Sequence, residues 1–550
     1  MTDGRRAGVV VLLLLVAGAV GAAAFPQLGA VRLGGVALAW WYGVVAAPLL
    51  AAFVALLLHR GGPVAAWMSP ALVGALVPRV FAGEPSALAL ALVGATAPLL
   101  APLAPRPLSG HDRVTTTLVA ASAGLALGGS LLVAADVARL LGVARWPALG
   151  VVAALTALAL LGPALASRAL WPGLLALAVP LIAIPLLGGP TPWEAWTALA
   201  ARPALVFAEA SPGTRQGVQV LEPTTLAFGE PHRVMAMREG VYRVLAREGD
   251  REAMREWRLT PGDSLTLRPG DRLDLTAGMR VRFEAGRRVP GAAASGVAWA
   301  ETRGLDPIAD ATEVLGAALS LTGGAAVLLA RRRWRERESP TKGARAAAIV
   351  AALAPWLLVL IVVCAGVYGA FAAPDLSLGA PGIAPLLGLP GVLPGAPWGR
   401  PLVTVILGGM GALLVATAGG LRRQVVPHGF MKTMRAPAFW VLIGAAAAVV
   451  LLGPKDPWRA LSLGCGLAGS AVAAPALAGG GSRARLAGAL VGAGAFVTLA
   501  LGLTGIDLPA SVAAYPVLMA APLAFAATSL AGSWAGRANF GRLVAARKQG

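Results

Sequence analysis

Charged side chains are rare in the apolar parts of this chain, and those that occur cluster near the ends of the apolar runs. Eight of them fall at run ends that we predict to face outward: Arg79, Glu84, Asp136, Arg139, Asp375, Asp456, Arg459 and Asp507. Outward carboxylates are the groups that acid–base chemistry on a lipid-linked sugar would use. Our candidate outer-face site consists of Arg79, Glu84, Asp136, Arg139, Asp375 and Asp507. The first outer loop, Pro26–Gly35, contains no acid, which weakens this enzyme interpretation.

A second candidate site is basic and lies in the polar middle of the chain. Arg280 and Arg282 alternate along a predicted strand, and Arg287 and Arg288 follow it. Such a pattern favours one basic strand face that meets anionic headgroups or an acidic partner. We therefore interpret the polar middle as a docking module rather than a catalytic domain.

The sequence gives little support for a metal site or a cofactor site. Cys364 and Cys465 both lie in apolar runs, where cysteine usually acts as a small hydrophobic residue, and His232 is the single histidine of the polar middle. The string AWWYG, Ala39–Gly43, is similar to the Trp-rich outer segment of the haem-handling proteins of cytochrome c maturation, but it lacks that family's acidic continuation. We predict no cofactor and no metal.

Composition places these residues in a membrane protein. The chain has 550 residues, of which 57% are hydrophobic and 13% charged, and its mean hydropathy is +0.73. Soluble domains carry about 25% charged residues, and a spanning helix needs about 20 apolar ones. We predict a polytopic α-helical membrane protein with about 14 transmembrane helices and an inserted small exported all-β domain.

The fourteen predicted spans form two groups of seven around the polar insert. The first group comprises 7–25, 36–58, 64–80, 86–104, 114–134, 147–167 and 169–189, of which 64–80 is the weakest because it is short and contains Pro70. The second comprises 309–330, 346–372, 401–421, 436–453, 458–478, 486–504 and 510–532. The corresponding domains are an N-terminal membrane bundle (1–190), the exported β-rich domain (191–306), a C-terminal membrane bundle (307–535) and a basic cytoplasmic tail (536–550).

Basic residues predict the orientation, because Lys and Arg accumulate in short cytoplasmic loops. With the N-terminus inside and its first apolar run retained, inner loops and tails hold 23 basic residues and outer short loops hold 7. This predicts a bacterial inner (plasma) membrane protein with both termini cytoplasmic and residues 191–306 outside. The net charge of +20 is explained by these loops, so we predict no nucleic-acid partner.

The polar insert is predicted to be an antiparallel β-sandwich or barrel. Residues alternate with period two in Ser264–Leu267, Arg272–Leu275 and Arg280–Phe283, and the triplet Pro-Gly-Asp ends at Asp263 and again at Asp271. Pro, Gly and Asp together are typical of turns, so we assign these two aspartates a turn-stabilising role.

Ionisable residues are absent from the central parts of the predicted spans, which weighs against a proton relay. The leading hypothesis is transport or translocation of an uncharged or lipid-like substrate. The alternative is a non-catalytic scaffold or assembly factor of an envelope or respiratory membrane complex, including haem handling of the cytochrome c maturation kind; an outer-face enzyme acting on lipid-linked sugars ranks third. Expected partners are the lipid bilayer and, for the alternative, subunits of such a complex.

Overall fold

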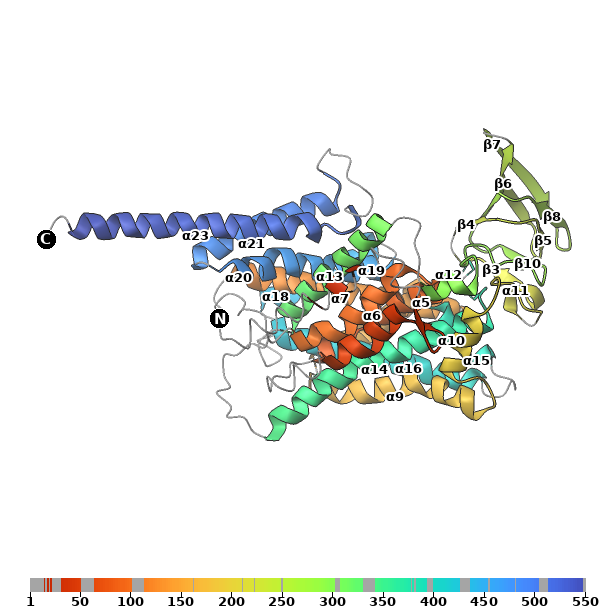
Figure 1. The fold of residues 1–550 in the computed structure, drawn as a ribbon, viewed down its shortest axis with the longest axis horizontal. Helices are drawn as coiled ribbons and strands as arrows, with labels where there is room; N and C mark the ends of the chain where they lie inside the picture. Colours follow the sequence, from red (N-terminus) through yellow and green to blue (C-terminus); the bar gives the residue numbers. More distant parts are fainter. Residues whose placement is uncertain are drawn as a thin grey trace.

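A computed structural model describes most of the chain. The described residues are 14, 17–18, 20–21, 31–50, 64–100, 113–161, 163–209, 211–221, 223–248, 251–301, 307–329, 342–376, 378–379, 382–392, 399–425, 436–453, 456–479, 481–503 and 513–547. They form a bundle of mostly long helices with a small β-domain at one end, and helix α23 (Val517–Arg547) extends beyond the opposite end (Figure 1).

Within the described part of the chain, eight helices are long and apolar enough to cross a membrane. They are Arg113–Leu140, Arg168–Leu186, Ile308–Leu328, Leu353–Ala372, Pro401–Arg422, Pro457–Ala478, Ser482–Ala500 and Val517–Trp534. Shorter apolar helices cover Leu38–Leu50, Pro70–Ala82, Ser86–Thr96 and Pro437–Leu452. Each predicted span after the first lies at least partly on helical residues, whereas most of the first, 7–25, lies outside the described residues.

The helical elements before the β-domain begin near the N-terminus with short pieces. Their bounds are α3 Leu38–Trp40, η1 Trp41–Ala46, η2 Val64–Ala66, α5 Pro70–Ala82, α6 Pro85–Leu100, α7 Arg113–Leu140, α8 Arg145–Leu161 and α9 Pro163–Leu186. After the β-domain come α13 Pro307–Leu328, α14 Lys342–Ala372, α15 Ala384–Val392, α16 Gly399–Val425, α18 Pro437–Leu452, α19 Pro457–Ala468, η5 Gly469–Ala473, α20 Ala474–Ala478, α21 Ser482–Ala500 and α23.

The two groups of helices share one hydrophobic core. Helix α7 packs mainly against α18 and α19, and α9 packs mainly against α16, so the closest partners come from opposite sides of the β-domain. Glycines allow this approach: a Cβ on Gly124 of α7 would collide with the carbonyl oxygen of Leu442, and one on Gly128 with Val449. Small residues of this kind are the usual means of close helix packing in lipid.

The weakest predicted span contains a break, residues 67–69, between a single 3-10 turn and α5. The short helix η2 ends at Ala66, and α5 begins at Pro70 after the non-helical residues Trp67 and Met68, with Ser69 as its N-cap. The Ser69 hydroxyl accepts a hydrogen bond from the Leu72 N–H at 3.2 Å, and proline at the first helical position has no N–H to satisfy. The start of α5 is therefore capped although it is buried inside the bundle.

The β-domain is a sandwich of two four-stranded sheets. One sheet has the order β3-β10-β5-β8 and the other β4-β9-β6-β7, and neighbouring strands in both are antiparallel. The strands are β3 Val218–Gln219, β4 Thr224–Ala227, β5 His232–Ala236, β6 Gly240–Glu248, β7 Arg251–Leu259, β8 Ser264–Leu267, β9 Arg272–Leu275 and β10 Arg280–Phe283. Inward-facing residues such as Tyr242, Leu273 and Val281 form a core of their own.

Both Pro-Gly-Asp triplets form turns. Gly262 and Gly270 have φ of 100° and 91°, which a side chain would strain. The carboxylate of Asp263 accepts the Thr260 N–H at 2.7 Å, and that of Asp271 accepts the Arg268 N–H at 2.7 Å. Each aspartate thus stabilises the turn that precedes its strand.

Candidate functional site

The six predicted outer-face residues separate into different surroundings. Arg79 and Glu84 come together at the end of the bundle next to the β-domain. Asp136 and Arg139 pair with each other near the end of α7, at 3.9 Å. Asp375 is buried under the β-domain, and Asp507 lies outside the described residues. The sequence therefore shows that charged residues lie near the ends of the predicted spans, but it does not show which of them meet in space.

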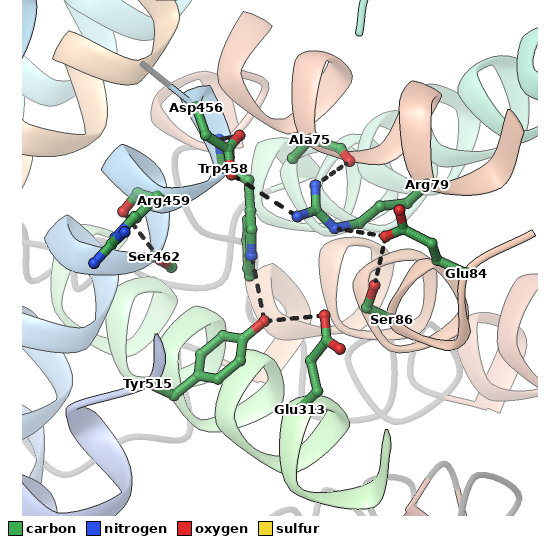
Figure 2. Close-up of polar contacts among 10 residues, drawn as sticks. All are labelled: Ala75, Arg79, Glu84, Ser86, Glu313, Asp456, Trp458, Arg459, Ser462 and Tyr515. Atoms are coloured by element: carbon green, nitrogen blue, oxygen red, sulfur yellow. Dashed lines mark hydrogen bonds and ion pairs between the residues drawn. The ribbon is translucent and has the colours of Figure 1, made fainter. Parts of the chain in front are cut away.

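Arg79 is the centre of a cluster that we call the outer polar cluster: Arg79, Glu84, Glu313, Asp456, Trp458 and Tyr515 (Figure 2). Arg79 and Glu84 lie at the end of α5 and in the link to α6, Glu313 lies in the first turns of α13, Asp456 and Trp458 lie at the start of α19, and Tyr515 lies just before α23. The cluster thus joins helices that precede the β-domain in the sequence with helices that follow it.

The guanidinium of Arg79 is held from several directions. It donates a hydrogen bond to the carbonyl oxygen of Ala75 at 3.0 Å and forms ion pairs with Glu84 at 3.5 Å and Asp456 at 3.9 Å. Its central carbon lies 5.6 Å from the ring centroid of Trp458, in the geometry of a cation–π contact. Both ion pairs are long and their carboxylates are half-exposed, so each alone contributes little to stability.

A second branch of the cluster runs inward from Trp458. Its indole N–H donates to the Tyr515 hydroxyl at 3.3 Å, and that hydroxyl donates to Glu313 at 3.4 Å. Trp458 and Tyr515 are both buried.

Two carboxylates, those of Glu84 and Asp456, pair with the Arg79 guanidinium, and the Glu313 carboxylate lies nearby. Burial raises the pKa of Glu84, Arg79 lowers it, and the carboxylates of Glu313 and Asp456 raise it further. The Ser86 hydroxyl donates to Glu84 at 3.4 Å. Among the described residues no group of three or more His, Cys, Asp or Glu side chains is arranged to hold a metal ion.

A small cavity lies deeper in the bundle, next to the break before α5. Its volume is about 10 Å³, close to the roughly 10–15 Å³ that one water molecule needs. Its lining includes Trp67, Ser69, Ala126, Leu328, Thr417 and Cys465, which come from the two groups of helices. Ala126 lies near the middle of α7, and Ser69 is ten residues before Arg79, about 15 Å along the helix.

Polar groups at the cavity satisfy the backbone of the break. The Thr417 hydroxyl donates to the carbonyl oxygens of Met68 at 3.0 Å and Leu413 at 2.8 Å, and the Trp67 indole donates to the Gly94 carbonyl at 2.8 Å. These contacts show how non-helical backbone is tolerated inside the bundle. No charged side chain lines the cavity.

Arg139 and Asp375 fix the β-domain to the bundle. Arg139 donates to the carbonyl oxygen of Leu221 at 2.8 Å, and the Leu221 N–H donates to that of Gly379 at 2.6 Å. Asp375 Oδ2 accepts the Gly213 N–H at 2.6 Å, whereas its buried Oδ1 has no hydrogen-bond partner among the described residues. Burial raises the pKa of Asp375. These contacts give both predicted site residues a structural role at the domain junction.

The four predicted docking arginines fall into two pairs that lie in different surroundings. Arg280 and Arg282 lie on β10, as the alternation predicts. Arg287 instead forms an ion pair with Glu284 at 3.7 Å, and the backbone of Arg288 binds Glu230 and His232. His232 is buried in the domain core with both ring nitrogens next to backbone carbonyls.

Sequence reasoning missed Glu313 and Tyr515 as members of the cluster. Glu313 has a local signal, because it follows Asp310 as a second acid within the first two turns of a helix that has no other charged residue. Tyr515 has none beyond its place before α23. Searches against family models, curated proteins and solved structures find no match for this chain.

Proposed function

We propose that this chain is a membrane transport protein for a small uncharged substrate, with its pathway at the interior cavity. One observation carries the proposal: helices from both groups meet around a cavity beside the non-helical residues 67–69, which precede α5. Many transporters bind their substrates where non-helical backbone lies inside the bundle. The uncharged lining favours an uncharged substrate over an ion.

The outer polar cluster closes this pathway on the side of the β-domain. It shares α5 and α19 with the cavity, and α13 contributes to both. Because its ion pairs are long and half-exposed, separating them requires less energy than exposing apolar core. The water-sized cavity then corresponds to the closed state of the pathway.

Proteoliposome swelling tests this function with defined solutes. Glycerol, urea and ribitol are added outside, and light scattering reports entry; we expect at least one to enter several-fold faster than into protein-free liposomes. Leu72→Trp or Ala126→Leu, which fill the cavity, should abolish the difference, whereas Leu490→Trp on an exposed face of α21 should not. Equal entry with and without protein for all three solutes would contradict the proposal, as would unchanged entry in both cavity variants when gel filtration shows folded protein.

A second candidate function is that of a scaffold, favoured by the way in which the β-domain is attached. Arg202 donates to the carbonyl oxygen of Phe371 at 2.7 Å and lies over its ring at 4.6 Å, in addition to the contacts of Arg139 and Asp375. A domain held by this many buried contacts presents its outer surfaces in a fixed orientation. If scaffolding is its role, the purified protein should retain a stoichiometric partner, and consistent isolation as a partner-free protein would count against this candidate.

A further inference from the structure

The two sheets of the β-domain differ in whether their surface arginines form ion pairs with acidic residues. On the sheet β4-β9-β6-β7, Arg243 forms an ion pair with Glu256 at 2.7 Å. Arg258, at its edge, pairs with Glu239 at 3.2 Å. These two arginines of the sheet are thus neutralised by acids of the same domain.

On the sheet β3-β10-β5-β8, three arginines share one outer face, and the acid that follows directly after β10, Glu284, pairs with Arg287 instead at 3.7 Å. Arg282 lies opposite Met235, two residues from Arg233, and Arg280 is two residues from Arg282, so all three point to the same side. Arg233 donates to the Ser264 hydroxyl at 3.2 Å, and Arg282 contacts the sulfur of Met235 at 3.0 Å. We call Arg233, Arg280 and Arg282 the arginine face; no carboxylate pairs with it within the described part of the chain.

The arginine face stands away from the bundle. Leu221, in the segment that follows β3, donates its N–H to the carbonyl oxygen of Gly379, which follows helix α14 of the bundle. Strand β3 is therefore the edge of the sheet nearer to the bundle, and β8 is the edge farther from it (Figure 1). The arginines lie on the second and third strands, about 5–10 Å beyond that edge at a strand spacing of about 4.8 Å. Lipid headgroups at the level of the bundle end would meet only the near margin of this face, whereas a protein surface can cover all of it.

We propose that the arginine face binds an acidic segment of a partner protein on the outer side. Guanidinium groups pair with carboxylates through two parallel hydrogen bonds, and three of them along neighbouring strands fit a run of acidic residues. The flat strand face offers small polar neighbours, Ser264 and Thr266, that do not obstruct such a segment. This inference does not depend on the transport proposal.

Binding of a fluorescein-labelled glutamate decapeptide to the full-length protein in zwitterionic nanodiscs tests the inference. The variant with Arg233→Gln, Arg280→Gln and Arg282→Gln should bind at least about tenfold more weakly and show a shallower salt dependence. The matched control replaces three arginines that already have acidic partners, Arg243, Arg258 and Arg287, with Gln; it loses the same charge and should bind within about twofold of the unmodified protein.

Two results would overturn the inference. Equal loss in both triple variants would show that net charge alone attracts the peptide. Alternatively, if the face variant binds the peptide normally but loses association with vesicles containing 30% phosphatidylglycerol, the face binds lipid and not protein. Thermal unfolding of each variant confirms that the β-domain remains folded, and if the face variant does not fold, the same comparison is made with Arg280→Lys and Arg282→Lys, which keep the charge but lose two-pronged pairing and should bind less tightly.

Discussion

Trp299 donates its indole N–H to the carbonyl oxygens of Val80 at 3.1 Å and Phe81 at 3.0 Å. Trp299 lies in α12 (Gly296–Glu301), directly after the β-domain, and the two carbonyls end helix α5. Terminal helix carbonyls have no partner within their own helix. The segment that leaves the β-domain therefore caps the helix that carries Arg79.

Trp299→Phe should destabilise the protein by about 1–3 kcal/mol, because it leaves the buried Phe81 carbonyl without a donor while it keeps most of the ring contact; the Val80 carbonyl retains the Gly83 N–H at 3.1 Å. Thermal unfolding in detergent measures the effect. Trp257→Phe, at an exposed position of β7, is the matched control and should have almost no effect. Equal effects of the two changes would rule out the capping role.

Asp375→Asn should stabilise the protein increasingly as the pH rises. The pKa of Asp375 is raised by burial above its ordinary value of 3.8, so the native state favours the neutral carboxyl. The stabilising contribution of the neutral Asp375 carboxyl to the free energy of unfolding is fully present when the pH is below 3.8, and it is lost as the pH rises through the folded-state pKa of Asp375. Melting temperatures of the two proteins between about pH 4 and pH 8 should diverge, with the Asn variant higher at the alkaline end.

Asp263→Asn is a control for which the expected pH dependence of stability is reversed. Hydrogen bonds from the Thr260 backbone and hydroxyl lower the pKa of Asp263, so its contribution is present above the ordinary value and is lost as the pH falls through the folded-state pKa. The Asn variant should therefore be less stable near neutral pH and equal in acid. Parallel pH profiles for the two variants would refute our assignment for Asp375.

Arg79→Gln should open the cavity to reagents from the side of the β-domain. Cys465 lines the cavity and is a built-in reporter once Cys364 is replaced by Ala. In a vesicle with that side outward, a membrane-impermeant thiol reagent should label Cys465 at least tenfold faster in the Gln variant, since the ion pairs and the cation–π contact at Arg79 are lost. Arg459→Gln, one residue after Trp458 and exposed, should leave the rate unchanged. A rate in the Arg79 variant no higher than in this control would show that the cluster does not close the pathway.

Gly124→Ala should destabilise the bundle by about 1–3 kcal/mol or more, because its methyl group would collide with the Leu442 carbonyl of α18. Gly444→Ala on α18 itself meets no atom within 4 Å and should be neutral or slightly stabilising. Thermal unfolding of both variants makes the comparison. Similar melting temperatures would mean that α7 and α18 can separate at little cost.

Local patterns in the sequence predict local structure well here. The three period-two segments coincide with β8, β9 and β10, and Pro70 marks the interruption before α5. Alternation and proline act within a few residues, so a single sequence reveals them. The meeting of Arg79 with Asp456 and Tyr515 depends on how helices hundreds of residues apart pack, and no local pattern encodes that choice.

The same limit explains the docking residues. Alternation placed Arg280 and Arg282 on one strand face correctly, but adjacent Arg287 and Arg288 follow the strand and are engaged by Glu284 and Glu230. Arg233 joins the face through the pairing of β5 with β10, which is a non-local register. Similarly, burial of Asp375 follows from the position of the whole β-domain and not from its neighbours in sequence.

The pairing of α7 with α18 and α19 has a consequence for how the chain is made. Ribosomes release α7 more than 300 residues before α19, whose first residue is Pro457. Until then, the glycine-lined side of α7 has no permanent neighbour and must be shielded by lipid, by the insertion machinery or by a temporary helix contact. Assembly of this protein is therefore completed late, and nascent chains that stop before α18 should be recognised by membrane quality-control proteases.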